Sequence, residues 1–374
     1  MKKSLIALAV LASAGAYAQS SVSLTGTIDA GMKRAIDQNP TKSFTGLTNN
    51  NTATSLLYFK GTEDMGFAKA GFLLELDFNP VSGSTANTAP GASTVYNGTP
   101  FNGEQFVSLA GAFGEVKLGQ PNAAALTAGT TAQPFGTALG GGYSGGFGRL
   151  GTAGSDGILN YVGNGSARIV RHEKTTQYST PSFAGVKATL EYAVQNDSAA
   201  GPSASNTNRY TSIAVAYNQG PVNAILVSAK AAAGAQAAEG TTAPNVTVAA
   251  ANALAVNTSV TTNMLAANYN FGPVIAYAGF TTTKNSVSTT EDSRSMNLAV
   301  KVPVTGSIDL MANYLKRDSK LAANADAKLL GLGVDYKLSA RTTVYARYEG
   351  LDTNTNDGAS GELKTTALGL KHTF

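Results

Sequence analysis

Charged side chains stand at alternate positions within several short apolar segments of this chain. Glu75 and Asp77 are separated by a leucine. Glu115 and Lys117 are separated by a valine. Because the side chains of a β-strand point alternately to its two faces, this spacing places the charges on one face and the apolar residues on the other. Such strands suit a wall between lipid and water, where the charges attract hydrated ions and do no covalent chemistry.

The same alternation selects the residues that would line an aqueous lumen. Lys60 faces the lumen if Leu57 and Phe59 face lipid. Opposed cationic and anionic walls would make a transverse field that filters ions by charge. The alternative is that each charge is a solvated lining residue without a role in selectivity. The candidate wall and constriction residues are Lys60, Glu75, Asp77, Glu115, Lys117, Arg168 and Arg171, with Arg149 and Asp156 on a long loop.

Two other groups of residues suggest an enzyme or a nucleotide site, and neither is complete. His172, Glu173 and several serines could be assembled into a hydrolase, but no serine lies near either His at a meaningful spacing. The glycine-rich run 140–148 could cradle a phosphate, but no Gly-Lys-Ser/Thr follows it. Cys is absent and His occurs twice, so we expect no metal site, no cofactor and no catalytic residues.

Composition narrows the class of protein further. The chain has 27 Lys and Arg against 23 Asp and Glu, a net charge of +4, without a polybasic run, which argues against nucleic-acid binding. Residues 1–18 have the pattern of a secretory signal, with Lys2 and Lys3 before an apolar run and Ala16-Tyr17-Ala18 at its end. Beyond it, no apolar stretch approaches the roughly 20 residues of a membrane-spanning helix. An exported chain that crosses a membrane must then use strands.

The remainder, 19–374, reads as one domain of strands about ten residues long, separated by two kinds of connection. Short turns rich in Gly, Pro, Asn and Asp occur at 61–66, 111–114, 181–185, 218–221, 270–273, 303–306 and 338–341. Long polar segments occur at 35–51, 79–100, 122–167, 195–207, 231–258, 284–292, 318–326 and 351–362. These connections predict an all-β, 16-stranded antiparallel transmembrane barrel with short periplasmic turns and long extracellular loops.

Two details refine this barrel. The third loop, about 122–167, is the longest, and we expect it to fold inward and constrict the pore, because a barrel of this size encloses an aqueous channel. Leu368, Leu370 and Phe374 share one face of the last strand, and Phe374 is expected to act as an assembly signal. An aromatic girdle beside the short turns is predicted from Tyr217, Tyr269, Tyr336 and Phe374.

As a set, several segments resemble the general porins of Gram-negative betaproteobacteria. They are the first strand at 21–31, the hairpin at 55–78, the hairpin before the third loop at 106–119, the strand and turn after it at 171–185, and the ending Lys371-His372-Thr373-Phe374. The resemblance implies a homotrimer in the outer-membrane bilayer, inserted by the outer-membrane assembly machinery. It also implies a water-filled channel for passive diffusion of ions and small hydrophilic solutes.

The chain departs from this family at three positions. The family usually carries Arg where this chain has Leu56, and often where it has Gly103 and Gln120, whereas Arg171 is retained. Those arginines form much of the basic wall of anion-selective relatives, so we expect a weakly selective pore. The alternatives are a substrate-preferring porin and a structural or adhesive barrel without a transport role.

Overall fold

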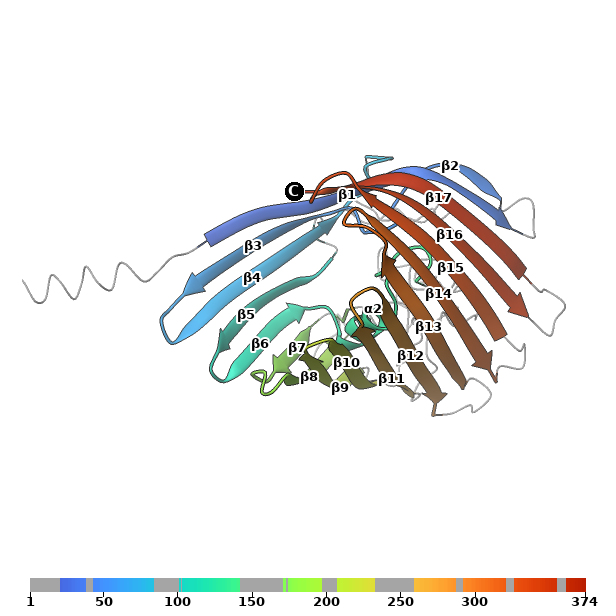
Figure 1. Cartoon of the computed structure of the whole chain (residues 1–374). Helices are drawn as coiled ribbons and strands as arrows, with labels where there is room; N and C mark the ends of the chain where they lie inside the picture. The colour runs from blue at the N-terminus through green and yellow to red at the C-terminus, as the bar shows by residue number, and fades with distance from the viewer. Residues whose placement is uncertain are drawn as a thin grey trace, which may run out of the picture.

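Strands joined edge to edge form the wall of the protein in the computed structural model (Figure 1). The structure describes residues 21–37, 43–83, 101, 103–141, 171–172, 174–196, 207–232, 259–286, 292–320, 326–354 and 361–374. The expected signal segment 1–18 lies outside the described residues, so the division into 1–18 and 19–374 stays a prediction.

Antiparallel pairing links each strand to its neighbours, and one helix lies within the described part of the third loop. The elements are β1 (Ser21–Asp37), β2 (Phe44–Asn49), β3 (Leu56–Asp64), β4 (Ala68–Asp77), β5 (Gln105–Gly111), β6 (Gly114–Gln120), α2 (Ala124–Thr131), β7 (Thr175–Ser179), β8 (Val186–Asn196), β9 (Thr207–Gln219), β10 (Val222–Ala232), β11 (Ser259–Asn270), β12 (Ile275–Asn285), β13 (Ser293–Pro303), β14 (Ile308–Ser319), β15 (Asp326–Lys337), β16 (Thr342–Asn354) and β17 (Gly361–Thr373). The predicted short turns join β3 to β4, β5 to β6, β7 to β8, β9 to β10, β11 to β12, β13 to β14 and β15 to β16.

β2 and β3 share one position in the wall, because both pair with β1. β1 pairs with β3 along its first part and with β2 further on. β1 also pairs with β17, from Thr27↔Thr373 to Asp37↔Leu363, and this pairing closes the ring. The predicted all-β, 16-stranded antiparallel barrel is therefore confirmed. The predicted loop at 35–51 is wrong in extent, because β2 occupies 44–49 of it.

The break between β2 and β3 is held from inside the barrel by Asp29 on β1. Its buried carboxylate accepts hydrogen bonds from three consecutive backbone N–H groups, those of 51–53, at 2.7–3.2 Å. The Tyr345 hydroxyl on β16 donates to the same carboxylate at 2.6 Å. Asn50 turns the chain out of the ladder with a φ of 57°. β2 is short and contains a glycine, so the alternation of apolar and polar residues in its sequence is weak. Its continuation into β3 depends on Asp29 and Tyr345, which lie elsewhere in the chain.

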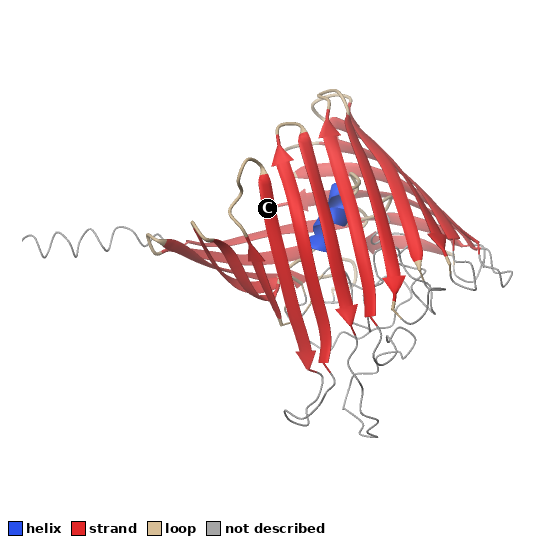
Figure 2. Ribbon diagram, turned by 90° about the horizontal axis from the view of Figure 1, so that it is seen from below, coloured by secondary structure: helices blue, strands red, loops and turns tan. Residues whose placement is uncertain are grey.

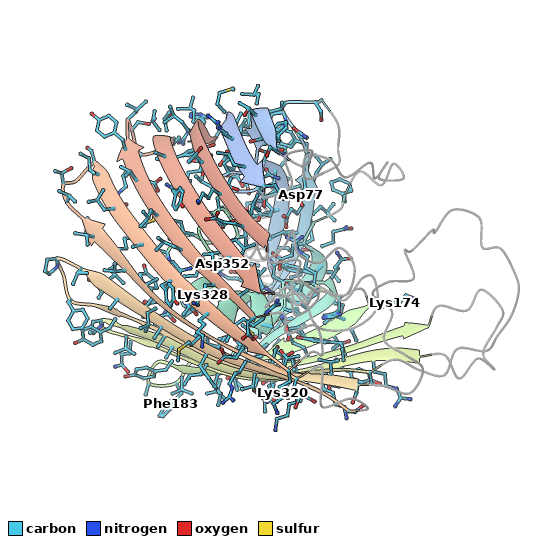
Figure 3. All side chains as sticks on the ribbon, turned by 90° about the vertical axis from the view of Figure 1, so that its right-hand side faces the viewer. Asp77, Lys174, Phe183, Lys320, Lys328 and Asp352 are labelled. Atoms are coloured by element: carbon cyan, nitrogen blue, oxygen red, sulfur yellow. The ribbon has the colours of Figure 1, made fainter. Side chains whose placement is uncertain are left out.

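Exposure of alternate residues confirms the predicted outer face. Leu368 and Leu370 on β17 are 62% and 47% exposed, whereas Ala367, which points to the other face of the strand, is 5% exposed. The aromatic residues predicted beside the short turns are exposed, and so are Phe67 and Phe183 within two of those turns. Phe183 stands on the outer surface of the wall in Figure 3. In the described part of the chain, no helix is long and apolar enough to cross a membrane.

Candidate functional site

Helix α2 lies inside the ring of strands (Figure 2), against β9–β12. Its Ala125 and Ala128 are fully buried and belong to one apolar cluster with Ile225 and Met264 of the wall. Alanine side chains let the helix approach the wall closely, because they project little from its axis. The predicted inward folding of the third loop is confirmed for 122–141, and 142–167 lies outside the described residues.

Polar side chains of the wall bind both ends of α2. Glu191 on β8 accepts a hydrogen bond from the Ala124 N–H at 2.9 Å. A helix N-terminus leaves N–H groups without partners, and α2 has no capping side chain of its own, so Glu191 serves as the cap. At the other end, Asn268 on β11 and Asn297 on β13 donate to the carbonyls of 131 and 132 at 3.0 and 2.6 Å.

The turn that follows α2 is bound by strands further round the barrel. The Gly140 carbonyl accepts a hydrogen bond from Asn313 on β14 at 2.9 Å, and the Gly140 N–H donates to Glu349 on β16 at 2.8 Å. Gly331 on β15 leaves the space for this turn, because a Cβ there would lie 2.3 Å from the Gly140 carbonyl oxygen. The third loop is thus tethered from β8 to β16, across the width of the lumen.

Sequence reasoning did not single out these tethers as site residues. Asn297, Asn313 and Glu349 all occupy lumen-facing alternate positions, and that signal is present in the sequence. Alternation identifies the face on which a polar side chain lies, but it does not identify the segment that the side chain will meet.

Arg171 and Glu75, both predicted wall residues, are in contact. The Arg171 guanidinium lies 3.0 Å from the Glu75 carboxylate and donates to the Asn122 side chain at 2.7 Å. Glu75 is 1% exposed and also accepts the Glu104 N–H at 2.7 Å. We expected cations and acids on opposite walls of the lumen, but the charges of this pair lie side by side. Their electric fields therefore largely cancel at points further away.

The other described candidates also have close partners. Lys117 lies 3.9 Å from the Glu115 carboxylate and 4.4 Å from the centre of the Phe106 ring. Lys60 lies 4.4 Å from the centre of the Tyr58 ring, and Asp77 is buried. Arg149, Asp156 and Arg168 lie outside the described residues.

Comparison with known proteins decides the family. A sequence model described as Gram-negative porin matches residues 4–356. The chain belongs to the Gram-negative porin family. Outer membrane porin protein 32 of Delftia acidovorans is 32% identical over 355 residues, which cover 92% of this chain and 88% of that protein. The solved anion-selective porin from Comamonas acidovorans aligns with a TM-score of 0.73 at 25% identity, over 95% of this chain and 100% of that one.

A more distant structure shares the fold. OmpT of Vibrio cholerae, solved in its trimer form, aligns with a TM-score of 0.65 at 14% identity, over 95% of this chain and 99% of that one. The family and the relatives identify this porin as an outer-membrane channel for passive diffusion. The predicted family, location and channel function are confirmed.

The three positions at which this porin departs from the expected arginines surround Glu75. Leu56 is buried and pairs with Asp77 across β3 and β4. Gly103 donates its N–H to the Glu75 carbonyl at 3.2 Å, and a Cβ there would lie 2.3 Å from the Glu75 side chain. Gln120 donates to the Gly103 carbonyl at 3.3 Å. None of these three residues adds a charge beside the Arg171–Glu75 pair of this porin, and the carboxyl groups of Asp77 and Glu104 also lie near it.

A second charged group, not predicted, lines the lumen of this porin on β13–β16. Asp309 is 2% exposed, and the Lys301 and Lys337 ammonium groups each lie 3.0 Å from its carboxylate. Arg347 is paired with Asp335 at 2.7 Å. These residues follow the same alternation as the predicted ones, so periodicity could have identified them. Here too, each cation adjoins an acid.

His172, considered above for a hydrolase, is buried against strand β9 of the porin. Its ring stacks on Tyr210 with centroids 3.7 Å apart. Glu173 lies outside the described residues. The described part of the chain contains no group of His, Cys, Asp and Glu residues able to hold a metal ion.

Proposed function

We propose that this porin is a weakly ion-selective diffusion channel constricted by the third loop and without enzymatic activity. The pairing of Arg171 with Glu75 carries the proposal. A lone arginine at this place would attract anions, but a buried carboxylate 3.0 Å away removes most of its field. The wall residues Lys60, Asp77, Glu115 and Lys117, with Arg149, Asp156 and Arg168, are proposed to tune ion flow weakly.

Replacing Glu75 by glutamine tests this proposal. Gln keeps the shape of the side chain and removes the negative charge, so less of the charge of Arg171 is balanced. We expect the chloride-to-potassium permeability ratio to rise on the order of sevenfold, because a potential of about one kT in the constriction favours chloride and disfavours potassium equally. The measurement is the reversal potential in planar bilayers under a KCl gradient.

Glu362→Gln is the matched control, because Glu362 lies on the exposed outer face of β17 and its loss changes the net charge equally. The control should leave the reversal potential unchanged. An unchanged reversal potential in Glu75→Gln would contradict the role given to the Arg171–Glu75 pair.

We further propose that residues 1–18 direct export and that the assembly machinery inserts the barrel as a homotrimer. The trimer form of the OmpT structure supports the oligomeric state. Phe374 supports the assembly step, because it lies at the seam where the barrel closes. Its N–H and C=O exchange 3.0 Å hydrogen bonds with Gly26, and a Cβ at Gly26 would lie 2.6 Å from its ring.

Replacing Phe374 by alanine should reduce the yield of folded trimer in the outer membrane several-fold, because the ring covers the β1–β17 seam. Phe374→Tyr retains the ring and should assemble normally. Yield is measured as the heat-modifiable trimer band from isolated membranes. Equal trimer yields for Phe374→Ala and the unaltered protein would argue that Phe374 has no part in assembly.

A further inference from the structure

Cationic side chains gather at one edge of the outer face of the barrel. On the described parts of β9–β17, every outward-facing Lys or Arg lies toward the strand ends that lead into long segments. These residues are Arg209, Lys230, Lys284, Arg294, Lys316, Lys328 and Lys364. Near the short turns, outward positions of the same strands carry Tyr217, Tyr269, Tyr336 and aliphatic residues. The two edges of the outer face therefore differ in chemistry.

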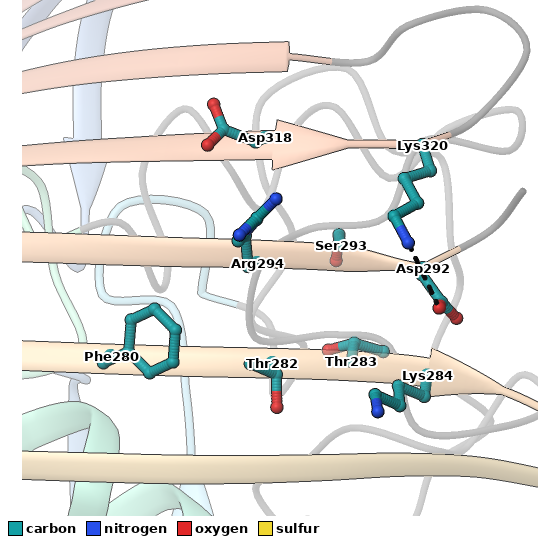
Figure 4. Close-up of a pocket in the computed structure, with 9 residues that line it drawn as sticks. All are labelled: Phe280, Thr282, Thr283, Lys284, Asp292, Ser293, Arg294, Asp318 and Lys320. Atoms are coloured by element: carbon teal, nitrogen blue, oxygen red, sulfur yellow. Dashed lines mark ion pairs between the residues drawn. The ribbon is translucent and has the colours of Figure 1, made fainter. Parts of the chain in front are cut away.

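Lys284 and Arg294 lie at the centre of the cationic edge (Figure 4). Arg294 on β13 pairs across the ladder with Thr282 on β12 and with Asp318 on β14. The two cations border a pocket of about 280 Å³, which is also lined by Phe280. Phe280 stands further from the loops along β12 than Lys284, so the pocket has an apolar end and a cationic end.

The charges of Lys284 and Arg294 are available to an external anion. Neither side chain has a hydrogen-bond or ion-pair partner among the described residues. Neighbouring cations are paired: Lys316 lies 2.7 Å from Asp318, and Lys320 lies 3.9 Å from Asp292. An arginine guanidinium presents a fork of donors that matches phosphate oxygens, and a lysine ammonium binds phosphate as a point charge.

The position of these cations along the strands indicates the depth at which they meet the membrane. The outer face next to them is apolar, with Phe280, Met296 and Leu298 exposed by 44%, 55% and 65%. A lipid-facing Lys or Arg costs about 2–4 kcal/mol at the bilayer midplane and about 0–1 kcal/mol near the interface. Cations that have no partner among the described residues and lie beside this apolar band therefore belong at the level of the lipid headgroups. Lys328 and its cross-strand partner Asp352 continue this edge on β15 and β16 (Figure 3).

We propose that Lys284 and Arg294 bind a phosphate group of a lipid headgroup in the outer leaflet, with Phe280 against the apolar part of the same lipid. Cations outnumber acids around the pocket, and anionic headgroups are the phosphates that an outward-facing cation meets at this depth. The site is on the opposite side of the wall from the lumen. It gives the barrel a lipid-recognition function separate from diffusion.

Binding of bisphosphorylated lipid A to the folded protein, followed by native mass spectrometry in detergent, tests the proposal. Lipid A from which both phosphates have been removed is the comparison ligand, and it should bind more weakly. We expect K284A/R294A to weaken binding of the phosphorylated form about 30-fold, since each cation near an anionic surface contributes about fivefold. K284R/R294K keeps both charges and should bind nearly as well as the unaltered protein.

Lys69→Glu is the matched control, because it changes the net charge by the same amount at the short-turn edge, where Lys69 is 68% exposed. It should retain binding. Equal binding of both lipid forms, undiminished binding by K284A/R294A, or an equal loss in the control would overturn the proposal. Displacement of the lipid by millimolar inorganic phosphate would assign the pocket to free phosphate and would also overturn it.

Discussion

Removing residues 124–140 of the third loop is expected to raise single-channel conductance roughly twofold, because this segment occupies the lumen of a barrel that is otherwise wide enough for an aqueous channel. The segment includes α2 and the turn at Gly140, which are tethered to the wall from Glu191 to Glu349. The strands themselves pair with each other and do not depend on the loop for their ladders. The barrel should therefore fold without the segment.

The measurement is the conductance step of single channels in planar bilayers at fixed salt. Gly331→Leu provides an independent variant, because its side chain would displace the turn at Gly140 without shortening the loop. Leu332→Ala is its control, since Leu332 is exposed on the outer face of the same strand. Conductance that stays the same after removal of 124–140 would show that this segment does not limit flow.

Replacing Asp29 by alanine should lower the free energy of unfolding by about 3–5 kcal/mol. The carboxylate is fully buried and accepts hydrogen bonds from the backbone of 51–53 and from Tyr345. Hydrogen bonds to a charged group contribute about 1.5–3 kcal/mol each, and loss of the acceptor leaves several buried donors unpaired. The third loop should loosen too, because the Leu139 N–H donates to the Asn51 carbonyl within this break.

This effect is measured by urea unfolding of the purified protein. Unfolding is followed by heat modifiability and by far-UV circular dichroism. Glu63→Ala is the control, because Glu63 is exposed on β3 and its removal causes the same change in net charge. Asp29→Asn should be intermediate, since the amide oxygen accepts some of the same hydrogen bonds. Equal stability of Asp29→Ala and Glu63→Ala would contradict the role of Asp29 in holding the break.

Much of the barrel could be predicted from the sequence because its strands follow a local rule. Residues such as Leu330 and Leu332 face outward while Gly331 between them faces the lumen, and every hairpin has a turn with suitable residues. The exception is the β2–β3 break, which depends on Asp29 and Tyr345. These two side chains lie far from the break in sequence, so periodicity within 35–55 contains no signal for it.

The candidate site was less predictable than the barrel. Alternation correctly placed Glu75 on the lumen side, but it could not show that Arg171 would lie against it, 96 residues further along the chain. Whether two lumen charges oppose or neutralise each other depends on the stagger of the strands and on the course of the third loop. Asn297 and Asn313 can be recognised as tethers only when the course of the third loop is known, because their own strands give no sign of the segment that they bind.

The conductance and reversal potential of the unaltered protein in planar bilayers, under a tenfold KCl gradient, test the central claim most directly. We expect open, water-filled conductance in steps of three and a reversal potential near zero, because Arg171 is neutralised by Glu75. A reversal potential close to the equilibrium potential of chloride or of potassium would contradict weak selectivity. Absence of conductance from well-folded protein would contradict the open channel itself.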